Sequence, residues 1–273
     1  MAEPNLFSEV ANSASDIVKN LPEDVKNDLV RGPAQEIGSG ISNLVYVVFS
    51  PLLMSRVRIE HKVKKMKEEL TKSINSIPSE KLVEPSLNIV GPALEGSKYY
   101  IENDSIRGLF VRLIASAANL DKRDEVHPSY VEIIKQLSPF DAKCLEFLVQ
   151  ETTSISCGTI IVNSTGGSGY QEVKYFFPFP GINKGNMEKY MSSVDNLIRL
   201  GILVCIENKF TDEKRYETLN TIVGKIAEDI EQDVKEKNPA ATAVLVGKAW
   251  SFTQLGEHFI NSCVIDKSIV DIG

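Results

Sequence analysis

The feature that most constrains the fold is residues 37–55, an unbroken run of 19 uncharged positions, IGSGISNLVYVVFSPLLMS. Its length, and the basic residues that follow it, are typical of a short membrane span. Glycine, serine, asparagine and proline reduce its apolar content to 11 of 19 positions, which favours a helix of a protein core with a break at Pro51. We expect the core helix, and conditional membrane insertion stays open as the alternative.

Residues 56–77 carry the clearest helical pattern in the chain. Their apolar residues recur every three or four positions and form one stripe, Ile59, Val63, Met66, Leu70, Ile74 and Ile77. Between Arg56 and Lys72, seven Lys or Arg residues stand against three Glu, a local net charge of +4. A solvated face is the simplest interpretation, and a contact surface for a membrane or a partner is the alternative. The candidate contact residues are Arg56, Arg58, Lys62, Lys64, Lys65 and Lys67.

Composition places the 273-residue chain among soluble globular proteins, because 42% of its residues are hydrophobic and 25% are charged. Its net charge of −7 repels phosphate, which disfavours broad non-specific binding of nucleic acid. Residues 1–20 contain three acidic residues and lack the apolar segment of a secretory signal. We therefore expect a cytoplasmic location, with membrane association left open. The four cysteines have no metal-ligand spacing and are expected to be buried free thiols.

The order of patterns predicts a mostly helical α+β protein. We expect a helical domain over 1–137 and a winged-helix-like α+β domain over 138–273. The second domain is expected to open with a helix capped by Ser138 and to close with a helix after Thr253. Between them we expect strands at 155–163, 170–177, 202–206, 214–219 and 243–251, with helices at 186–200 and from Asn220 to about 237. In the first domain, Asp104 is expected to cap a helix buried on most of its circumference.

A winged helix can read DNA through its second helix, where the candidates are Lys189, Asn196 and Arg199. The same helix carries Glu188 and Asp195, and residues 141–273 hold 13 basic against 18 acidic side chains. We therefore expect a protein partner or self-association rather than nucleic acid, and a winged-helix DNA-binding regulator or sensor is the alternative.

No strong catalytic motif occurs in the chain, so we expect a protein that is not an enzyme, with no catalytic residues, metal or cofactor. The glycine-rich turn 166–169 lacks the lysine and helix start of a phosphate loop and suits a hairpin tip. Glu172 and Lys174 match half of a metal-dependent nuclease motif, but acid-x-Lys occurs seven times here. A nuclease is the weakest alternative. His127, which precedes Pro128, is expected to order a turn.

Several segments resemble the Abi-alpha family of bacterial proteins. They are Ile77–Pro85, Val90–Glu95, Leu109–Ser116 and His127–Ala142, with further similarity at Asn196–Leu203 and Thr253–Phe259. The resemblance spans about residues 20–265. It implies a role in abortive infection, in which an infected bacterium arrests or dies before phage spreads. It supplies no catalytic set, so no functional residue is carried over. Together these patterns predict a non-enzymatic anti-phage protein that acts through protein or membrane contacts.

Overall fold

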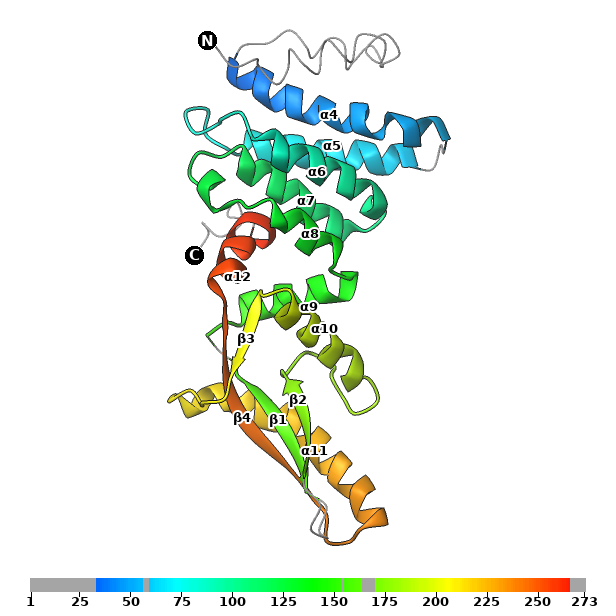
Figure 1. Ribbon diagram of the computed structural model, residues 1–273, viewed down its shortest axis with the longest axis vertical. Coiled ribbons are helices and arrows are strands. Elements are labelled where there is room, and N and C mark those ends of the chain that lie inside the picture. Colours follow the sequence, from blue (N-terminus) through cyan, green and yellow to red (C-terminus); the bar gives the residue numbers. More distant parts are fainter. Residues whose placement is uncertain (1–32, 56–58, 154, 164–169, 266–273) are drawn as a thin grey trace. The chain divides into compact units, whose positions relative to one another are not determined.

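The computed structural model describes residues 33–55, 59–153, 155–163 and 170–265 (Figure 1). The first 32 residues of the expected helical domain, the basic residues Arg56 and Arg58, and the glycine-rich turn 166–169 lie outside this part. The described residues form two compact units. One contains the described residues up to Gln136 together with those from His258 onward, and the other contains Leu137–Glu257.

The first unit is built from helices. Its α-helices are α4 (Pro33–Ser55), α5 (Glu60–Asn75), α6 (Leu87–Ser97), α7 (Asp104–Ala117) and α8 (Ser129–Lys135). Short 3-10 turns add η2 (Lys98–Tyr100) and η3 (Arg123–Glu125). Helix α7 contacts α5, α6 and α8, and it is buried around most of its circumference, as its sequence predicts.

Helix α4 contains the whole uncharged run, and the expected break at Pro51 is wrong, because the helix continues through that residue to Ser55. Pro51 is exposed, and the side chain of Ser50 donates a hydrogen bond to the carbonyl of Val47, which occupies one acceptor near the proline. Ile41, Val45 and Phe49 recur every four residues and are fully buried, as expected of a core helix. Among the helices of the described ranges, none combines the length and apolar character that a membrane crossing requires.

The stripe predicted for residues 56–77 is confirmed over the helix itself. Ile59, Val63, Met66, Leu70 and Ile74 are all buried, and the helix ends at Asn75, ahead of Pro78. Burying such a stripe is what holds an otherwise charged helix in a core. The expected cap of α7 is wrong by one position, because the side chain of Asn103, not Asp104, accepts the hydrogen bond from the backbone of Ile106.

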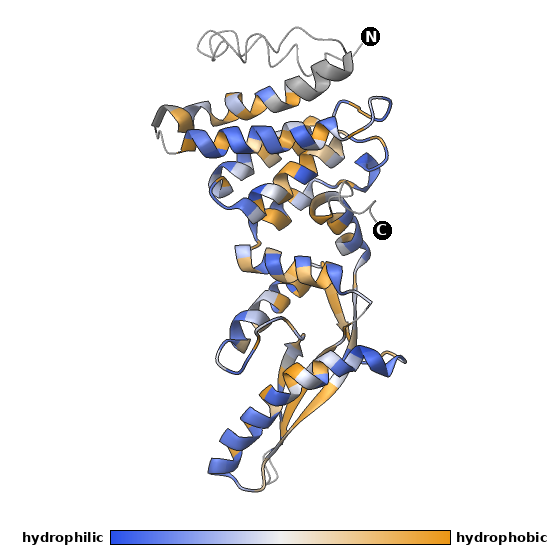
Figure 2. Ribbon diagram, turned by 180° about the vertical axis from the view of Figure 1, so that it is seen from behind, coloured by the Kyte–Doolittle hydropathy of each residue, from blue (hydrophilic) through white to orange (hydrophobic). Residues whose placement is uncertain are grey.

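The second unit surrounds an antiparallel sheet with strand order β2-β1-β4-β3. The strands are β1 (Cys157–Asn163), β2 (Tyr170–Phe176), β3 (Leu203–Ile206) and β4 (Thr242–Phe252). The helices are α9 (Pro139–Gln150), α10 (Met187–Arg199), α11 (Glu217–Lys237) and the start of α12 (Gln254–Phe259). Helix α11 packs on β4 and β1. Figure 2 shows largely hydrophobic strands and a hydrophilic C-terminal half of α11.

Local capping signals in this unit are confirmed. Ser138 and Asp141 form a capping box at the start of α9, with Pro139 in the first turn. Helix α10 ends before Gly201, whose φ of 71° lies in the left-handed region that glycine adopts without strain. The side chain of Thr253 accepts a hydrogen bond from the backbone of Gly256 at 2.9 Å and so begins α12.

Two expectations in this unit are wrong. Residues 214–219 are not a strand, because a 3-10 turn, η4 (Glu213–Tyr216), runs directly into α11. The long helix therefore begins at Glu217 rather than after Asn220. Long-range contacts explain the difference, since Tyr216 is buried and Arg215 donates hydrogen bonds to the carbonyls of Thr152 and Ile155.

The C-terminal segment also differs from its expected place. The sequence predicts one α+β domain over residues 138–273, whereas the described residues from His258 onward belong to the helical unit. There α12 continues as a π-helix, η5 (Ile260–Val264), which contacts α7. Three side chains of the helical unit, Arg112, Ser116 and Lys122, donate hydrogen bonds to carbonyls of residues 261–263. These bonds satisfy backbone acceptors that a π-helix leaves open at its end.

Candidate functional site

The basic residues of α5 fall into two groups on different sides of the helix. Lys62 and Lys65 both reach Asp104 at the start of α7, with nitrogen–oxygen distances of 3.3 and 2.8 Å. Lys64 and Lys67 lie on the side that faces α4, and together with Lys72 on the outer flank they line a groove beside α4. The six candidate contact residues therefore do not form one surface. Two are neutralised within the fold, two line the groove, and Arg56 and Arg58 lie outside the described residues.

The neutralised side of α5 is organised by Arg107, which is fully buried in α7. Its guanidinium makes a bidentate pair with Glu69, with both nitrogen–oxygen distances at 2.9 Å. The remaining nitrogen of the guanidinium, Nη1, donates to Asp104 at 2.7 Å and to the carbonyl of Ile101 at 2.9 Å. The planar fork of arginine matches a carboxylate in this geometry, so the network fixes α5 against α7.

The charges of this network shift the pKa values of Asp104 and Arg107. Hydrogen bonds from Lys65, Arg107 and Lys62 hold the pKa of Asp104 far below its ordinary range. Burial alone would lower the pKa of Arg107, but hydrogen bonds to Glu69 and Asp104 raise it above its ordinary value. Asp104 and Arg107 therefore both stay charged at neutral pH. We interpret the network as a structural ion-pair cluster, since its groups bond to one another.

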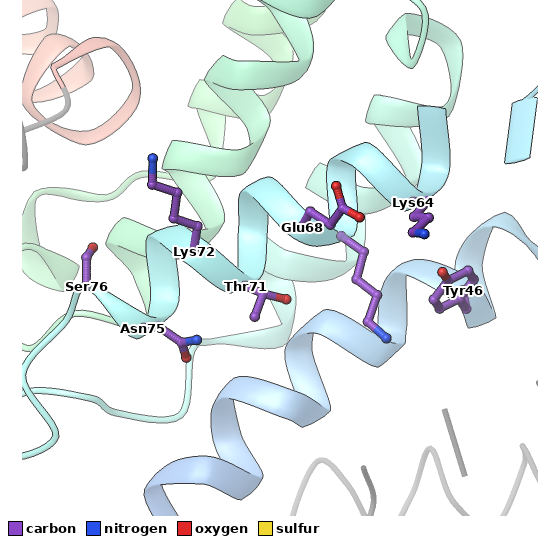
Figure 3. A pocket seen from close by; sticks show the side chains of 8 residues that line it. Tyr46, Lys64, Glu68, Thr71, Lys72, Asn75 and Ser76 are labelled. Carbon is purple, nitrogen blue, oxygen red and sulfur yellow. The ribbon is translucent and has the colours of Figure 1, made fainter. Parts of the chain in front are cut away.

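The opposite side of α5 forms the α4–α5 groove, a cavity of about 700 Å³ (Figure 3). Its lining residues are Tyr46 of α4, Lys64, Lys67, Glu68, Thr71, Lys72 and Asn75 of α5, and Ser76. Figure 3 shows Thr71 and Asn75 on the side of α5 that faces α4, with Glu68 and Lys72 on the outer flank. The groove lies entirely within the helical unit.

Charge in this groove is not balanced. In the described part of the chain, Lys64, Lys67 and Lys72 form no ion pair, and neither does Glu68. Three ammonium groups against one carboxylate leave a local charge of +2. The Lys67 ammonium lies 4.9 Å from the centre of the Tyr46 ring, a cation–π contact that holds its stem along the groove wall. Unpaired positive charge beside a cavity attracts anions.

The three DNA-contact candidates of α10 are engaged inside their own unit. Lys189 lies 3.9 Å from the centre of the Phe140 ring. The amide of Asn196 donates to Asp141 at 3.0 Å and accepts from the guanidinium of Arg199 at 2.7 Å. The buried Asp141 also accepts from the backbone of Ser138 at 2.7 Å. These contacts join α9 to α10 and give the three residues a packing role.

Three of the four cysteine thiols have raised pKa values. Cys144, Cys157 and Cys263 are buried, whereas Cys205 is only partly so. Burial raises the pKa of the Cys144 thiol to about 11 and that of Cys263 further. The pKa of Cys157 is raised by its hydrogen bond with Cys205 and by burial. Thiols with raised pKa values stay protonated and are poor nucleophiles.

His127 orders the turn before α8, as expected. Its Nδ1 accepts a hydrogen bond from the backbone N–H of Ser129 at 3.1 Å and lies 2.7 Å from the Ser129 hydroxyl. In the nuclease alternative, Glu172 lies on β2, an edge strand of the sheet, and the side chain of Lys174 lies outside the described residues. Within the described ranges, no three His, Cys, Asp or Glu side chains gather closely enough to hold a metal ion.

Sequence reasoning missed Lys72, Thr71 and Asn75 of the groove and the role of Arg107. A helical projection contains the signal for both, because residues 64, 67, 71 and 75 recur at steps of three and four along one side of α5. Residues 62, 65 and 69 recur in the same way along another side. Arg107 stands in an otherwise apolar stretch of α7, and a buried arginine requires acidic partners.

The described residues thus define a mostly helical α+β protein with a basic groove in its helical unit. The model of the abortive infection alpha family matches residues 57–263, about three quarters of the chain. The chain therefore belongs to the abortive infection alpha family. Comparison with curated proteins and with solved structures gives no match.

Proposed function

We propose that this protein acts in abortive infection without making or breaking covalent bonds, by contacting an acidic partner protein or membrane surface through the α4–α5 groove. The observation that carries the proposal is the unequal pairing of the lysines of α5. Lys62 and Lys65 are neutralised by Asp104, whereas Lys64, Lys67 and Lys72 keep their charge. Family membership supports the role in abortive infection.

Electrostatics explains why the unpaired lysines suit a contact surface. The whole chain has a net charge of −7, so an acidic partner is repelled by most of the protein and attracted by this side of α5. A basic patch on an acidic protein therefore sets the orientation of approach. The alternative, a winged-helix DNA-binding regulator, has less support, because Lys189, Asn196 and Arg199 contact residues of their own unit.

The test is phage infection of a bacterium that expresses the protein, with plaque counts, growth and membrane potential as readouts. In the groove variant, Lys64, Lys67 and Lys72 are all changed to Glu, which has nearly the same helix propensity as Lys. The control variant carries the same change at Lys143, Lys214 and Lys225, which are exposed and unpaired within the described residues. Both variants shift the net charge equally.

We expect wild-type protein and the control variant to reduce plaque numbers and the groove variant to lose this effect. Rapid depolarisation of infected cells would identify a membrane as the acidic surface, and arrest without depolarisation would identify a protein. Equal protection by both variants would refute the role of the groove. Loss of protection in Glu172→Ala, with nicking of plasmid DNA by wild-type protein alone, would refute the non-enzymatic mechanism.

A further inference from the structure

We propose that the α4–α5 groove is a binding site for a soluble small molecule that carries two or more phosphate groups. This inference goes beyond the proposed function, because a bound polyphosphate would neutralise the lysines and compete with the acidic partner for the same groove.

The charge of the groove calls for a multivalent anion. Lys64 and Lys67 are one helical turn apart on the side of α5 that faces α4, and Lys72 lies on the outer flank of the helix at the far end of the groove. The adjacent like charges of Lys64 and Lys67 repel one another and weaken the helix. One phosphate cannot balance three ammonium groups, whereas a chain of two or three phosphates carries enough charge to bridge Lys64 and Lys67 and extend toward Lys72.

The lining also contains a neutral hydrogen-bond donor suited to phosphate oxygens. The Asn75 side chain is exposed at the α4 side of the groove, and its amide has two N–H donors. Ser76 adds no donor, because its hydroxyl already donates to the carbonyl of Ser73. Lysine and amide donors together are the usual means by which proteins hold phosphate.

The size of the groove suits a small-molecule ligand. Its volume of about 700 Å³ lies within the range of about 300–1,000 Å³ that is typical of small-molecule sites. Among the described residues that line it, three lysines and one amide supply the polar contacts, and the Lys67 ammonium lies over the ring of Tyr46. Vesicles that contain phosphatidylglycerol distinguish a lipid headgroup from a soluble ligand at this site.

The charge of Glu68 predicts the direction in which a change at this residue shifts the affinity for an anion. Its carboxylate lines the groove and forms no ion pair within the described residues, so it repels a bound anion. Glu68→Gln keeps the size of the side chain and removes this repulsion. A polyphosphate ligand should therefore bind more tightly to Glu68→Gln than to wild type. A merely structural role of Glu68 would not produce tighter binding.

The experiment is calorimetric titration of the purified full chain with inorganic tripolyphosphate, at low and at moderate salt. We expect saturable binding of one equivalent that weakens with salt. Changing Lys64, Lys67 and Lys72 to Gln should weaken it by about tenfold or more, as expected for the loss of charge-assisted hydrogen bonds. The same change at Lys143, Lys214 and Lys225 should alter it by less than about twofold, and Glu68→Gln should tighten it. Asn75→Asp, a single exposed change that adds a carboxylate, should also weaken binding if the triple variant does not fold.

Three results would overturn the inference. They are no saturable binding of tripolyphosphate, an equal loss in the groove and control variants, and binding only to vesicles that contain phosphatidylglycerol. The inference and the proposed function fail separately. Binding of tripolyphosphate without any protection against phage would refute the proposed function alone, and protection that depends on the groove lysines without tripolyphosphate binding would refute the inference alone.

Discussion

The ion-pair network between α5 and α7 predicts an asymmetry between its two main partners. Arg107 is fully buried, whereas the side chain of Glu69 is 34% exposed. Glu69→Ala leaves a buried guanidinium with two N–H groups that have lost their acceptors. Arg107→Met removes the buried charge, keeps most of the side-chain volume, and leaves Glu69 where water and Lys65 can still reach it. The loss of Glu69 should therefore cost more than the loss of Arg107.

The magnitude follows from the burial of the guanidinium. Removing one partner of a buried ion pair costs about 3–5 kcal/mol of the free energy of unfolding, because the other charge is left uncompensated. Asp104 and the Ile101 carbonyl still bind Arg107 in Glu69→Ala, so we expect a cost near the lower limit, about 3 kcal/mol. For Arg107→Met we expect about 2 kcal/mol, because an exposed carboxylate is solvated.

The assay is urea unfolding followed by circular dichroism, with the midpoint and slope fitted for each variant. Glu68→Ala is the matched control on the same helix, since Glu68 is exposed and should change stability by less than about 0.5 kcal/mol. The double variant of Glu69 and Arg107 should be more stable than the sum of the two single changes predicts, by about 1–3 kcal/mol. Additive costs, or a Glu69→Ala cost equal to that of Glu68→Ala, would refute this reasoning.

Four further predictions concern single residues. The pKa of Asp104 is lower in the folded than in the unfolded protein, so the ion pairs of Asp104 stabilise the fold fully above about pH 4, the unfolded pKa. This stabilisation declines as the pH falls below that value. Asp104→Asn should therefore flatten the loss of stability in acid, measured as the unfolding midpoint from pH 6 to pH 2. Gly256→Ala should disrupt α12, because an added Cβ would lie 2.0 Å from the carbonyl oxygen of Ile202. At Gly224, in the interior of α11, an added Cβ meets no atom within 4 Å, so Gly224→Ala should raise the free energy of unfolding by about 0.5–1 kcal/mol, measured by thermal unfolding. Asn43 is 7% exposed, and neither of its amide atoms has a hydrogen-bond partner among the described residues. Asn43→Leu should therefore raise the melting temperature, and an unchanged or lower value would show that the amide is satisfied in solution.

Local signals in the sequence predicted local structure well. The capping box at Ser138 and the stop at Gly201 depend on a few adjacent residues and on backbone geometry, and both are confirmed. The stripe of α5 was equally readable, because burial of one face is encoded in the spacing of its apolar residues. The segment 214–219 failed for the opposite reason. Its helical start depends on the burial of Tyr216 and on bonds from Arg215 to residues 60 or more positions away.

The candidate site shows the same limit at the level of charge. Counting lysines over residues 56–72 gave a net positive charge and a contact surface, but a count cannot tell which lysines the fold neutralises. That depends on Asp104, which lies about 40 positions away and which the sequence suggested as a helix cap. Because Asn103 caps α7 instead, the Asp104 carboxylate is directed to Lys62 and Lys65. One change of cap therefore decides which side of α5 keeps its charge, and so where an anion can bind.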